Sequence, residues 1–471
     1  MLKILTKYIF TALFILVYFT ANSQNAQLRG KITDVSNNEA VAFANVIVEG
    51  TQIGGTSDFD GNFTITGLEP GYVKLRVSFI GYKTKLSADV LVNNKSIPFI
   101  EIELEQSEET LDEVVITVDP FEKTQEAPLS MQSIGVKEIE SNAGSNRDIS
   151  RVIQSFPGVG STPAFRNDVI IRGGGPSENR FFLDGVEIPV LNHFSTQGAS
   201  GGPVGIINAD FIESVDFYSG SFQANKYNAL SGILDFRQKE GSRDKTNFQV
   251  TIGASEAAFT VDGPIGKKTS FIFSVRRSYL QFLFSAIGLP FLPTYNDYQF
   301  KLKTNINAKN QITIISLGSL DNLALNDGIK DPDAGQEYIL NQIPINDQWS
   351  YTFGIVYKNF FKNGFHTVVL SRNMLNNSFY KYPNNDETKE KAFDYLSTEA
   401  ENKLRYEVSL RKNGFKYNFS ANTEYADYYN KTSQQVYLND SLSTFNYESS
   451  LNIIKYGLSA QASKKFFSNS L

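Results

Sequence analysis

The residue types that most often carry out chemistry are scarce in this chain of 471 residues, which contains no Cys and only two His. Without Cys there is no disulfide, thiolate metal site or Cys nucleophile. The two His residues, His193 and His366, leave little for a zinc site or a Ser-His-Asp triad. We therefore expect no catalytic residue, no metal site, no cofactor and no enzymatic activity. We interpret His193, which lies in a stretch rich in Gly and Ser, as a possible contact to a ligand.

Two polar motifs resemble binding sites but lack the residues that such sites need. The glycine run 173–175 follows a predicted strand, as a phosphate-binding loop does, yet another strand follows it and no Gly-Lys-Ser/Thr appears. We interpret it as a turn, with Arg172 paired to a carboxylate. Asp58, Asp60 and Asn62 have the spacing of a calcium loop without its bidentate Glu. The sequence predicts a turn stabilised by Asp side chains there.

The overall charge and the first residues restrict where the protein works. With 50 acidic and 44 basic residues, the chain has no electrostatic footprint for nucleic acid. Lys3 and Lys7 precede an apolar run over residues 8–19, and small residues at 21–23 offer a cleavage site. We interpret residues 1–23 as a secretory signal peptide, so the mature protein leaves the cytoplasm.

The chain is too long for one ordinary domain, and its patterns indicate several parts. Short alternating strands with turn residues between them predict a β-sandwich over residues 27–106. An acidic linker, residues 107–127, contains one apolar, strand-like segment. Residues 128–240 mix predicted strands with helices at 147–153 and at 209–215, and so read as an α/β domain.

From residue 247 to 471 the pattern is long, regular alternation of apolar and polar residues. Asn-Gly turns within 362–364 and 412–414 and a tight turn at 308–310 alternate with long polar connections at 321–347 and 382–390. Dyad alternation with tight turns on one side is typical of a transmembrane β-barrel. We count about nine strands, whereas plugged transporters close with about 22. We therefore expect a mainly β protein with an incomplete barrel, from a fragment or a truncated copy, whose first and last strands do not pair.

Several segments also resemble a known family. Residues 146–153, 156–159, 169–173, 182–186, 212–215, 218–220 and 227–234 follow the order and spacing of the plug domain of TonB-dependent outer-membrane receptors. The sandwich is similar to the carboxypeptidase regulatory-like domain that many Bacteroidetes-type receptors carry before the plug. The apolar segment of the linker resembles a TonB box, which would consist of Leu111, Asp112, Glu113, Val114, Val115, Ile116 and Thr117. The matching plug motif includes Arg172, Gly173, Asp184, Gly185, Glu213, Gly220 and Gly232.

The resemblance implies energised uptake across the outer membrane. Substrate would bind outside, TonB would capture the box by strand addition, and the plug would then rearrange. The implied partners are TonB, outer-membrane lipid and a substrate that the sequence does not name. The insert of glycan-importing SusC-like receptors is not recognisable. The alternatives are a binding or signalling receptor that does not import, and an inactive truncated copy.

Overall fold

The computed structural model describes residues 26–107, 131–142, 148–160, 166–199, 201–202, 204–253, 255–438 and 441–464. The predicted signal peptide (1–23) and TonB box (111–117) lie outside the described residues. The chain divides into two compact units, one comprising Met1–Thr33 and Ala40–Leu104 and the other Asp34–Glu39 and Glu105–Leu471. Within the described ranges, no helix is long and apolar enough to cross a membrane.

The first unit is the predicted β-sandwich. Its strands are β1 (Ala26–Asp34), β2 (Asn45–Val48), β3 (Gly54–Thr56), β4 (Asn62–Leu68), β5 (Gly71–Val73), β6 (Leu75–Ser78), β7 (Lys85–Leu86), β8 (Val90–Val92) and β9 (Phe99–Leu104). They form groups in the orders β4-β1-β9, β3-β2-β6-β7 and β5-β8. Leu75 and Val77 are buried while Arg76 between them is half-buried, as the alternation predicts. Asp58 forms the predicted turn, because its carboxylate accepts hydrogen bonds from the amides of Asp60 (2.9 Å) and Asn62 (2.8 Å).

The α/β domain is built on a five-stranded sheet in the order β10-β15-β16-β13-β14. β13 and β16 pair parallel, and the other neighbours pair antiparallel. The elements are β10 (Met131–Gly135), α2 (Val136–Ser141), α3 (Ile149–Ile153), β11 (Val159–Gly160), β12 (Ile170–Ile171), η1 (Pro176–Glu178), β13 (Asn179–Leu183), β14 (Val186–Ile188), η2 (Ala209–Phe211), β15 (Ile212–Tyr218) and β16 (Gly232–Gln238).

The two predicted helices of this domain are shorter than expected. Asp148 caps α3 by accepting a hydrogen bond from the Ser150 amide at 2.9 Å, so α3 begins at Ile149. The helix predicted over 209–215 is wrong beyond its first turn: η2 covers only Ala209–Phe211, and β15 begins at Ile212. β15 is an interior strand that pairs on both sides, and this pairing decides the conformation of its residues.

The remainder of the second unit is one antiparallel sheet of ten strands, here called the wall, in which the strand order follows the chain order. Its strands are β17 (Asn247–Ile252), β18 (Glu256–Ile265), β19 (Thr269–Ser278), β20 (Phe291–Asn307), β21 (Asn310–Leu325), β22 (Ile345–Phe361), β23 (Gly364–Lys381), β24 (Phe393–Lys412), β25 (Phe415–Leu438) and β26 (Ser441–Ser463). The sequence predicts about nine strands, one fewer than the structure describes. Asn413 and Gly414 have φ of 52° and 72°, as the predicted Asn-Gly hairpin requires.

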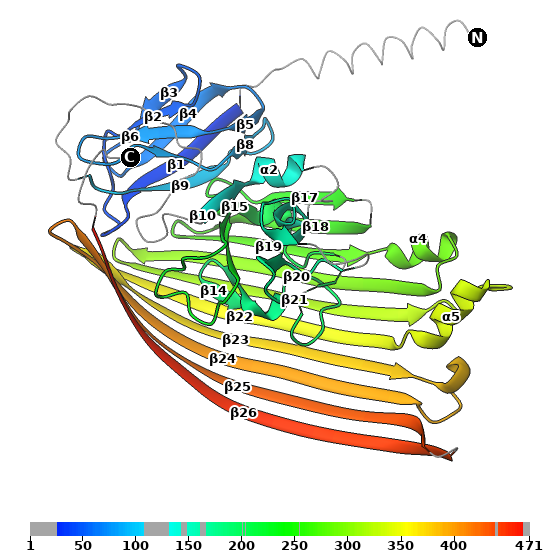
Figure 1. The fold of residues 1–471 in the computed structure, drawn as a ribbon. Coiled ribbons are helices and arrows are strands. Elements are labelled where there is room, and N and C mark those ends of the chain that lie inside the picture. Colours follow the sequence, from blue (N-terminus) through cyan, green and yellow to red (C-terminus); the bar gives the residue numbers. More distant parts are fainter. Residues whose placement is uncertain are drawn as a thin grey trace, which may run out of the picture. The chain divides into compact units, whose positions relative to one another are not determined.

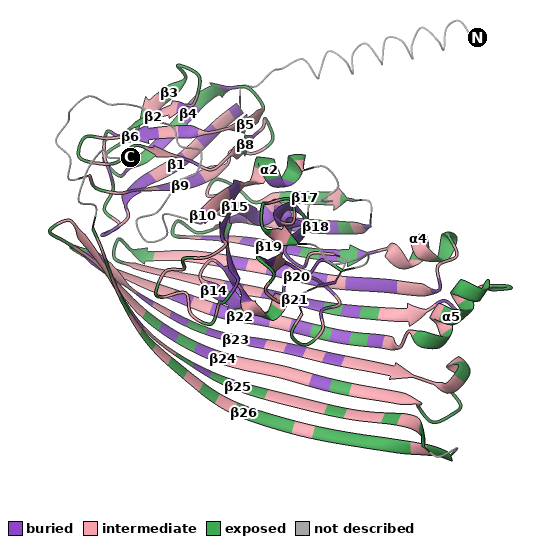
Figure 2. Cartoon of the chain, in the orientation of Figure 1, coloured by how far each residue is buried: buried purple, intermediate pink, exposed green. Residues whose placement is uncertain are grey.

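Figure 1 shows the wall as a curved sheet with the α/β domain against it. The longer connections lie at one end of the wall and contain the helices α4 (Leu280–Ala286) and α5 (Ala334–Gln342) and the 3-10 turn η3 (Pro383–Asn385), whereas the tight turns lie at the other end. β17 and β26 are the edges of the sheet, and these two described strands do not pair with each other, as predicted. Burial concentrates in the α/β domain and the middle strands, while β26 is largely exposed (Figure 2).

Candidate functional site

The α/β domain contacts the wall through the hairpin of β13 and β14. Asp184 and Gly185 form its two-residue turn, with φ of 46° and 85°, and Leu183 pairs with Val186 across it. β14 packs on β22 and β23 of the wall. A Cβ placed on Gly354 of β22 would lie 2.5 Å from Cγ2 of Val186, so only glycine lets the two elements approach this closely.

A first group of buried charges surrounds Lys301 of β20. Its Nζ lies 3.2 Å from Oδ2 of Asp184 and 3.1 Å from Oε1 of Glu240, and it donates a hydrogen bond of 2.8 Å to the carbonyl of Gln238. Asp184 also accepts bonds from the Gln238 amide (3.0 Å) and side chain (2.9 Å). Burial disfavours the charged form of Glu240, but Lys301 and Lys303 outweigh it and lower the pKa of Glu240 to about 2.

Glu213, another predicted motif residue, belongs to the same electrostatic group. It is half-buried on β15, and burial raises its pKa above the ordinary value although Lys301 and Arg237 act in the opposite direction. The nearby carboxylates of Glu240 and Asp184 raise it further. The structure therefore places Asp184, Glu213 and Lys301 in one cluster of interacting charges.

A second group surrounds Lys403 of β24. Its Nζ lies 3.0 Å from Oε1 of Glu187 in the α/β domain, 2.7 Å from Oε2 of Glu401 and 3.7 Å from Oε2 of Glu424. Two residues along the strand, Arg405 donates a hydrogen bond of 2.7 Å to the carbonyl of Gly185. This group thus binds the hairpin through Glu187 and Gly185, whereas Lys301 binds it through Asp184.

A third group forms around His193, whose ring is fully buried at 0% exposure. Nδ1 lies 2.7 Å from Oδ1 of Asp321, and Nε2 lies 3.0 Å from Oδ2 of Asp297. The ring of Tyr295 stacks on the imidazole with 4.2 Å between centroids. Burial disfavours the imidazolium, but the two carboxylates outweigh it and raise the pKa of His193 from 6.5 to about 9. Two acceptors require two N–H donors, so His193 is an imidazolium here.

The loop that carries His193 is held from both sides. Asn192 donates to Oδ2 of Asp148, the cap of α3, at 3.2 Å, and accepts from the Ser150 hydroxyl at 2.9 Å. From the wall, Arg276 donates to Asp297 (2.9 Å) and to the carbonyls of Gly205 (2.9 Å) and Ile206 (2.8 Å). A ligand could contact His193 only after this loop moved.

Arg172 and three of the motif glycines, Gly173, Gly220 and Gly232, lie outside these three groups. Arg172 is exposed with φ of 51°, and Nη2 donates to the Ser219 hydroxyl at 3.2 Å. No carboxylate of a described residue pairs with Arg172, and its predicted carboxylate partner stays a prediction. Gly173 and Gly220 have φ of 80° and 154° and form turns, and Gly232 lies where a Cβ would overlap the side chain of Ile171.

The sequence-based prediction did not include the wall residues of these groups. Asp297, Gln299, Lys301 and Lys303 alternate along β20, so a polar stripe of period two was present to be found. Within the described part of the chain, no group of three or more His, Asp or Glu residues has the geometry to hold a metal ion.

The site is thus an α/β domain held by buried charges on one face of a wall of long antiparallel strands, an arrangement similar to that of plugged outer-membrane receptors. The comparisons with known proteins agree. Residues 123–233 match the TonB-dependent receptor plug domain, and residues 28–116 match the CarboxypepD_reg-like domain. The α/β domain is thus a plug domain, and the protein is a homologue of TonB-dependent receptors.

Individual relatives cover the chain only in part. TonB-dependent receptor P39 of Formosa agariphila is 28% identical over 237 residues, which are 47% of this chain and 21% of that protein. The ferric enterobactin receptor PfeA of Pseudomonas aeruginosa shares the fold with a TM-score of 0.52 at 16% identity, over 73% of this chain and 57% of that one. The copper transporter OprC also shares the fold, with a TM-score of 0.50 at 11% identity, over 70% of this chain and 51% of that one. The chain therefore spans about a fifth of the curated relative and just over half of these solved structures.

Proposed function

We propose that this protein is an outer-membrane receptor that takes up a substrate when TonB pulls on its plug. The observation that carries the proposal is the way the plug meets the wall. Lys301, Lys403 and His193 each join the two through buried ion pairs. Such contacts fix position and orientation but stabilise weakly in net terms, because the desolvation of the charges offsets their attraction.

The small number of apolar contacts between the plug and the wall supports the same function. Few wall residues join the hydrophobic core of the plug, namely Ile315, Leu317, Val356 and Val369. Water that entered between plug and wall would hydrate charges rather than a large apolar surface. A plug held in this way can shift without exposing its own core, which is what passage of a substrate past it demands.

TonB would act on the segment 111–117. Its apolar residues Val114, Val115 and Ile116 suit pairing with an added strand, where main-chain hydrogen bonds provide the affinity. At 11% and 16% identity the solved neighbours indicate the fold alone, so neither copper nor a ferric siderophore is carried over as the substrate.

The experiment is proline substitution in the box. Val115→Pro removes a main-chain donor and blocks strand addition, so energised uptake should be lost while substrate binding to cells is retained. Lys123→Pro, in the same linker but outside the box, is the matched control and should import normally. Normal uptake by Val115→Pro would refute the proposal, and uptake unaffected by deletion of 112–117 would favour a binding receptor that does not import.

A further inference from the structure

The tight-turn end of the wall has an unusual charge. The stretches 264–270, 307–311, 360–366 and 411–417 contain no Asp or Glu. Their cationic residues are Lys267, Lys268, Lys309, Lys362, Arg411, Lys412 and Lys416. The connection between β21 and β22 at the other end, residues 326–344, has the opposite character, with four acidic residues and one Lys. The two ends of the wall therefore attract different ions.

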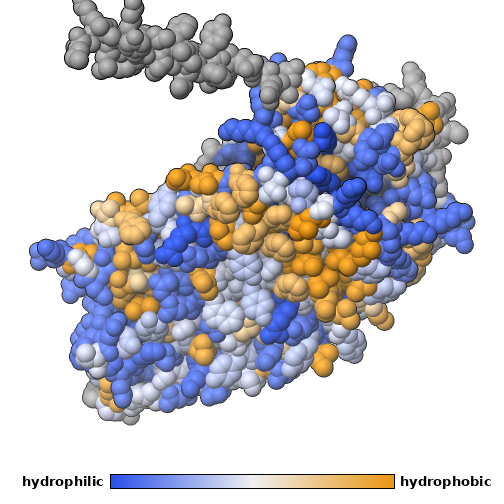
Figure 3. Space-filling view, turned by 180° about the vertical axis from the view of Figure 1, so that it is seen from behind, coloured by the Kyte–Doolittle hydropathy of each residue, from blue (hydrophilic) through white to orange (hydrophobic). Residues whose placement is uncertain are grey.

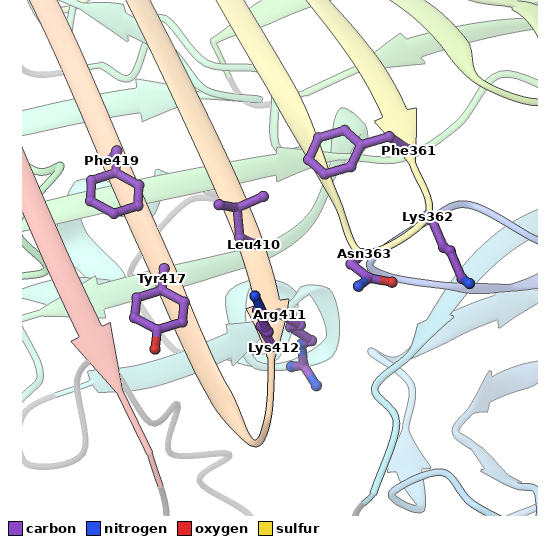
Figure 4. Close-up of a pocket in the computed structure, with 8 residues that line it drawn as sticks. All are labelled: Phe361, Lys362, Asn363, Leu410, Arg411, Lys412, Tyr417 and Phe419. Atoms are coloured by element: carbon purple, nitrogen blue, oxygen red, sulfur yellow. The ribbon is translucent and has the colours of Figure 1, made fainter.

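A hollow of about 500 Å³ opens among these turns, on the strands β22 to β25. Phe361 pairs with Gly364, Gly364 with Leu410, and Leu410 with Tyr417, so one row crosses four strands. Gly364 supplies no side chain to this row, and the backbone of Ser409 comes so close that a Cβ at Gly364 would lie 2.0 Å from its carbonyl oxygen. Figure 4 shows Phe361 and Leu410 on two strands that line the hollow, with Tyr417 and Phe419 on the next strand.

The hollow faces away from the plug. On β24 the buried residues Lys403 and Arg405 alternate with Leu404, which is 44% exposed, and Leu410 is in phase with Leu404. On β25 Glu424 is buried and Phe419 is 45% exposed. Figure 3 shows hydrophobic side chains gathered over parts of the wall seen from behind. In a membrane this is the face that meets lipid.

Two lysines lie at the rim of the hollow. Lys362 and Lys412 are exposed, and neither forms an ion pair with any described residue. An aromatic and aliphatic floor with cations at its edge matches a lipid, whose acyl chain is apolar and whose phosphate is anionic. An acidic protein or a cell-wall polymer would use the cations but not the apolar floor.

We propose that this hollow binds an anionic phospholipid of the membrane leaflet on the tight-turn side. The acyl chain would lie along Phe361, Leu410 and Phe419, and the phosphate would lie between Lys362 and Lys412. The site rests on the proposed function, because the outer face of the wall meets lipid only if the wall is in a membrane. Lipid bound here would hold the wall at a fixed depth.

The test measures lipid binding to the protein purified in detergent, by native mass spectrometry with phosphatidylglycerol as the probe. The variant K362Q/K412Q should bind the lipid about 25-fold more weakly, since each lysine near an anionic lipid contributes about fivefold. The control K330Q/K389Q removes the same charge at the other end and should bind as the wild type does. Circular dichroism should show the same strand content in all three proteins.

Two results would overturn the site. One is equal phosphatidylglycerol binding by the wild type and K362Q/K412Q. The other is a variant that loses binding of soluble peptidoglycan fragments but keeps the lipid, which would assign the cations to the cell wall. The proposed function fails by different results, namely normal uptake in Val115→Pro or absence of the protein from the outer-membrane fraction. Lipid binding in detergent requires neither TonB nor a substrate, so the two failures are distinguishable.

Discussion

Nδ1 of His193, in the plug, lies 2.7 Å from Oδ1 of Asp321, on the wall. The other ring nitrogen contacts Asp297, so one imidazolium joins the plug to two strands, β20 and β21. The remaining charges that face this group are Arg276, which pairs with Asp297, and Glu256, which contacts Arg276 and the hydroxyl of Tyr295. The proton on His193 therefore helps to attach the plug to the wall.

This arrangement predicts that the plug is held less tightly in alkaline solution. The pKa of His193 is raised from 6.5 to about 9 in the folded state, so its contribution is fully present below pH 6.5 and is lost as the pH rises through 9. The shift corresponds to about 3 kcal/mol. The measurement is an NMR titration of protein labelled at histidine, in which His193 should titrate near pH 9. Because the chain has only two His, the variant His366→Gln assigns the signal.

Leakage gives a second measurement of the same prediction. Entry of antibiotics that are too large for porins should rise between pH 6.5 and 9 in cells with the wild type. In His193→Gln, which cannot titrate, leakage should not change with pH. A His193 signal that titrates at its ordinary value would show that the two carboxylates do not hold the proton.

Removal of the cation at Lys301 should loosen the plug more severely. Lys301→Met leaves the Asp184 carboxylate without its buried cation and leaves Glu240 with Lys303 alone, and breaking a buried ion pair costs about 3 to 5 kcal/mol. We expect faster proteolysis of the plug and more antibiotic leakage at equal protein abundance. Lys309→Met, at the exposed turn between β20 and β21, is the control and should change neither proteolysis nor leakage. Addition of Glu240→Gln to Lys301→Met should restore part of the loss, whereas no difference between the two lysine variants would contradict the role of Lys301.

The sequence predicts the wall well because its signals are local. Alternation along a strand and an Asn-Gly turn such as Asn413-Gly414 depend on neighbouring residues only, so they are readable without a structure. The prediction of a helix over 209–215 is wrong because the contacts that decide its structure are not local. Ile212 to Val215 have helical spacing, but β15 pairs with β10 on one side and β16 on the other, and neither contact is local.

The partners in the site could not be predicted in the same way. Asp297 and Asp321 lie 104 and 128 residues from His193 in the chain. Their meeting depends on the register of β20 with β21 and on where the plug docks. The sequence does select Asp184, Gly185 and Glu213 through the family resemblance, and the structure pairs Asp184 with Lys301, whose charge also acts on Glu213. The polar stripe of β20 is visible in the sequence, but nothing local indicates that Lys301 of this stripe meets Asp184.

Arg172 should be nearly dispensable for retention of the plug. Its side chain is exposed and, among the described residues, donates a hydrogen bond only to Ser219, so Arg172→Ala should change stability by no more than about 0.5 kcal/mol. Leakage of antibiotics should match the wild type. Leakage as large as that of Lys301→Met would mean that Arg172 has a carboxylate partner after all.

The close approach of Gly354 to Val186 gives a prediction about shape rather than charge. Gly354→Ala places a methyl group 2.5 Å from the Val186 side chain, so the hairpin must move outward or the wall must bend. Overpacking of this kind costs about 1 to 3 kcal/mol, and it should displace Asp184, two residues before Val186, from Lys301. Proteolysis of the plug and leakage should therefore rise together in Gly354→Ala.

Gly328→Ala, in an exposed connection with room for the methyl group, should behave as the wild type. The double variant Gly354→Ala/Val186→Ala removes the clash and should recover most of the loss. A double variant as leaky as Gly354→Ala would show that the contact between these two residues does not set the position of the hairpin.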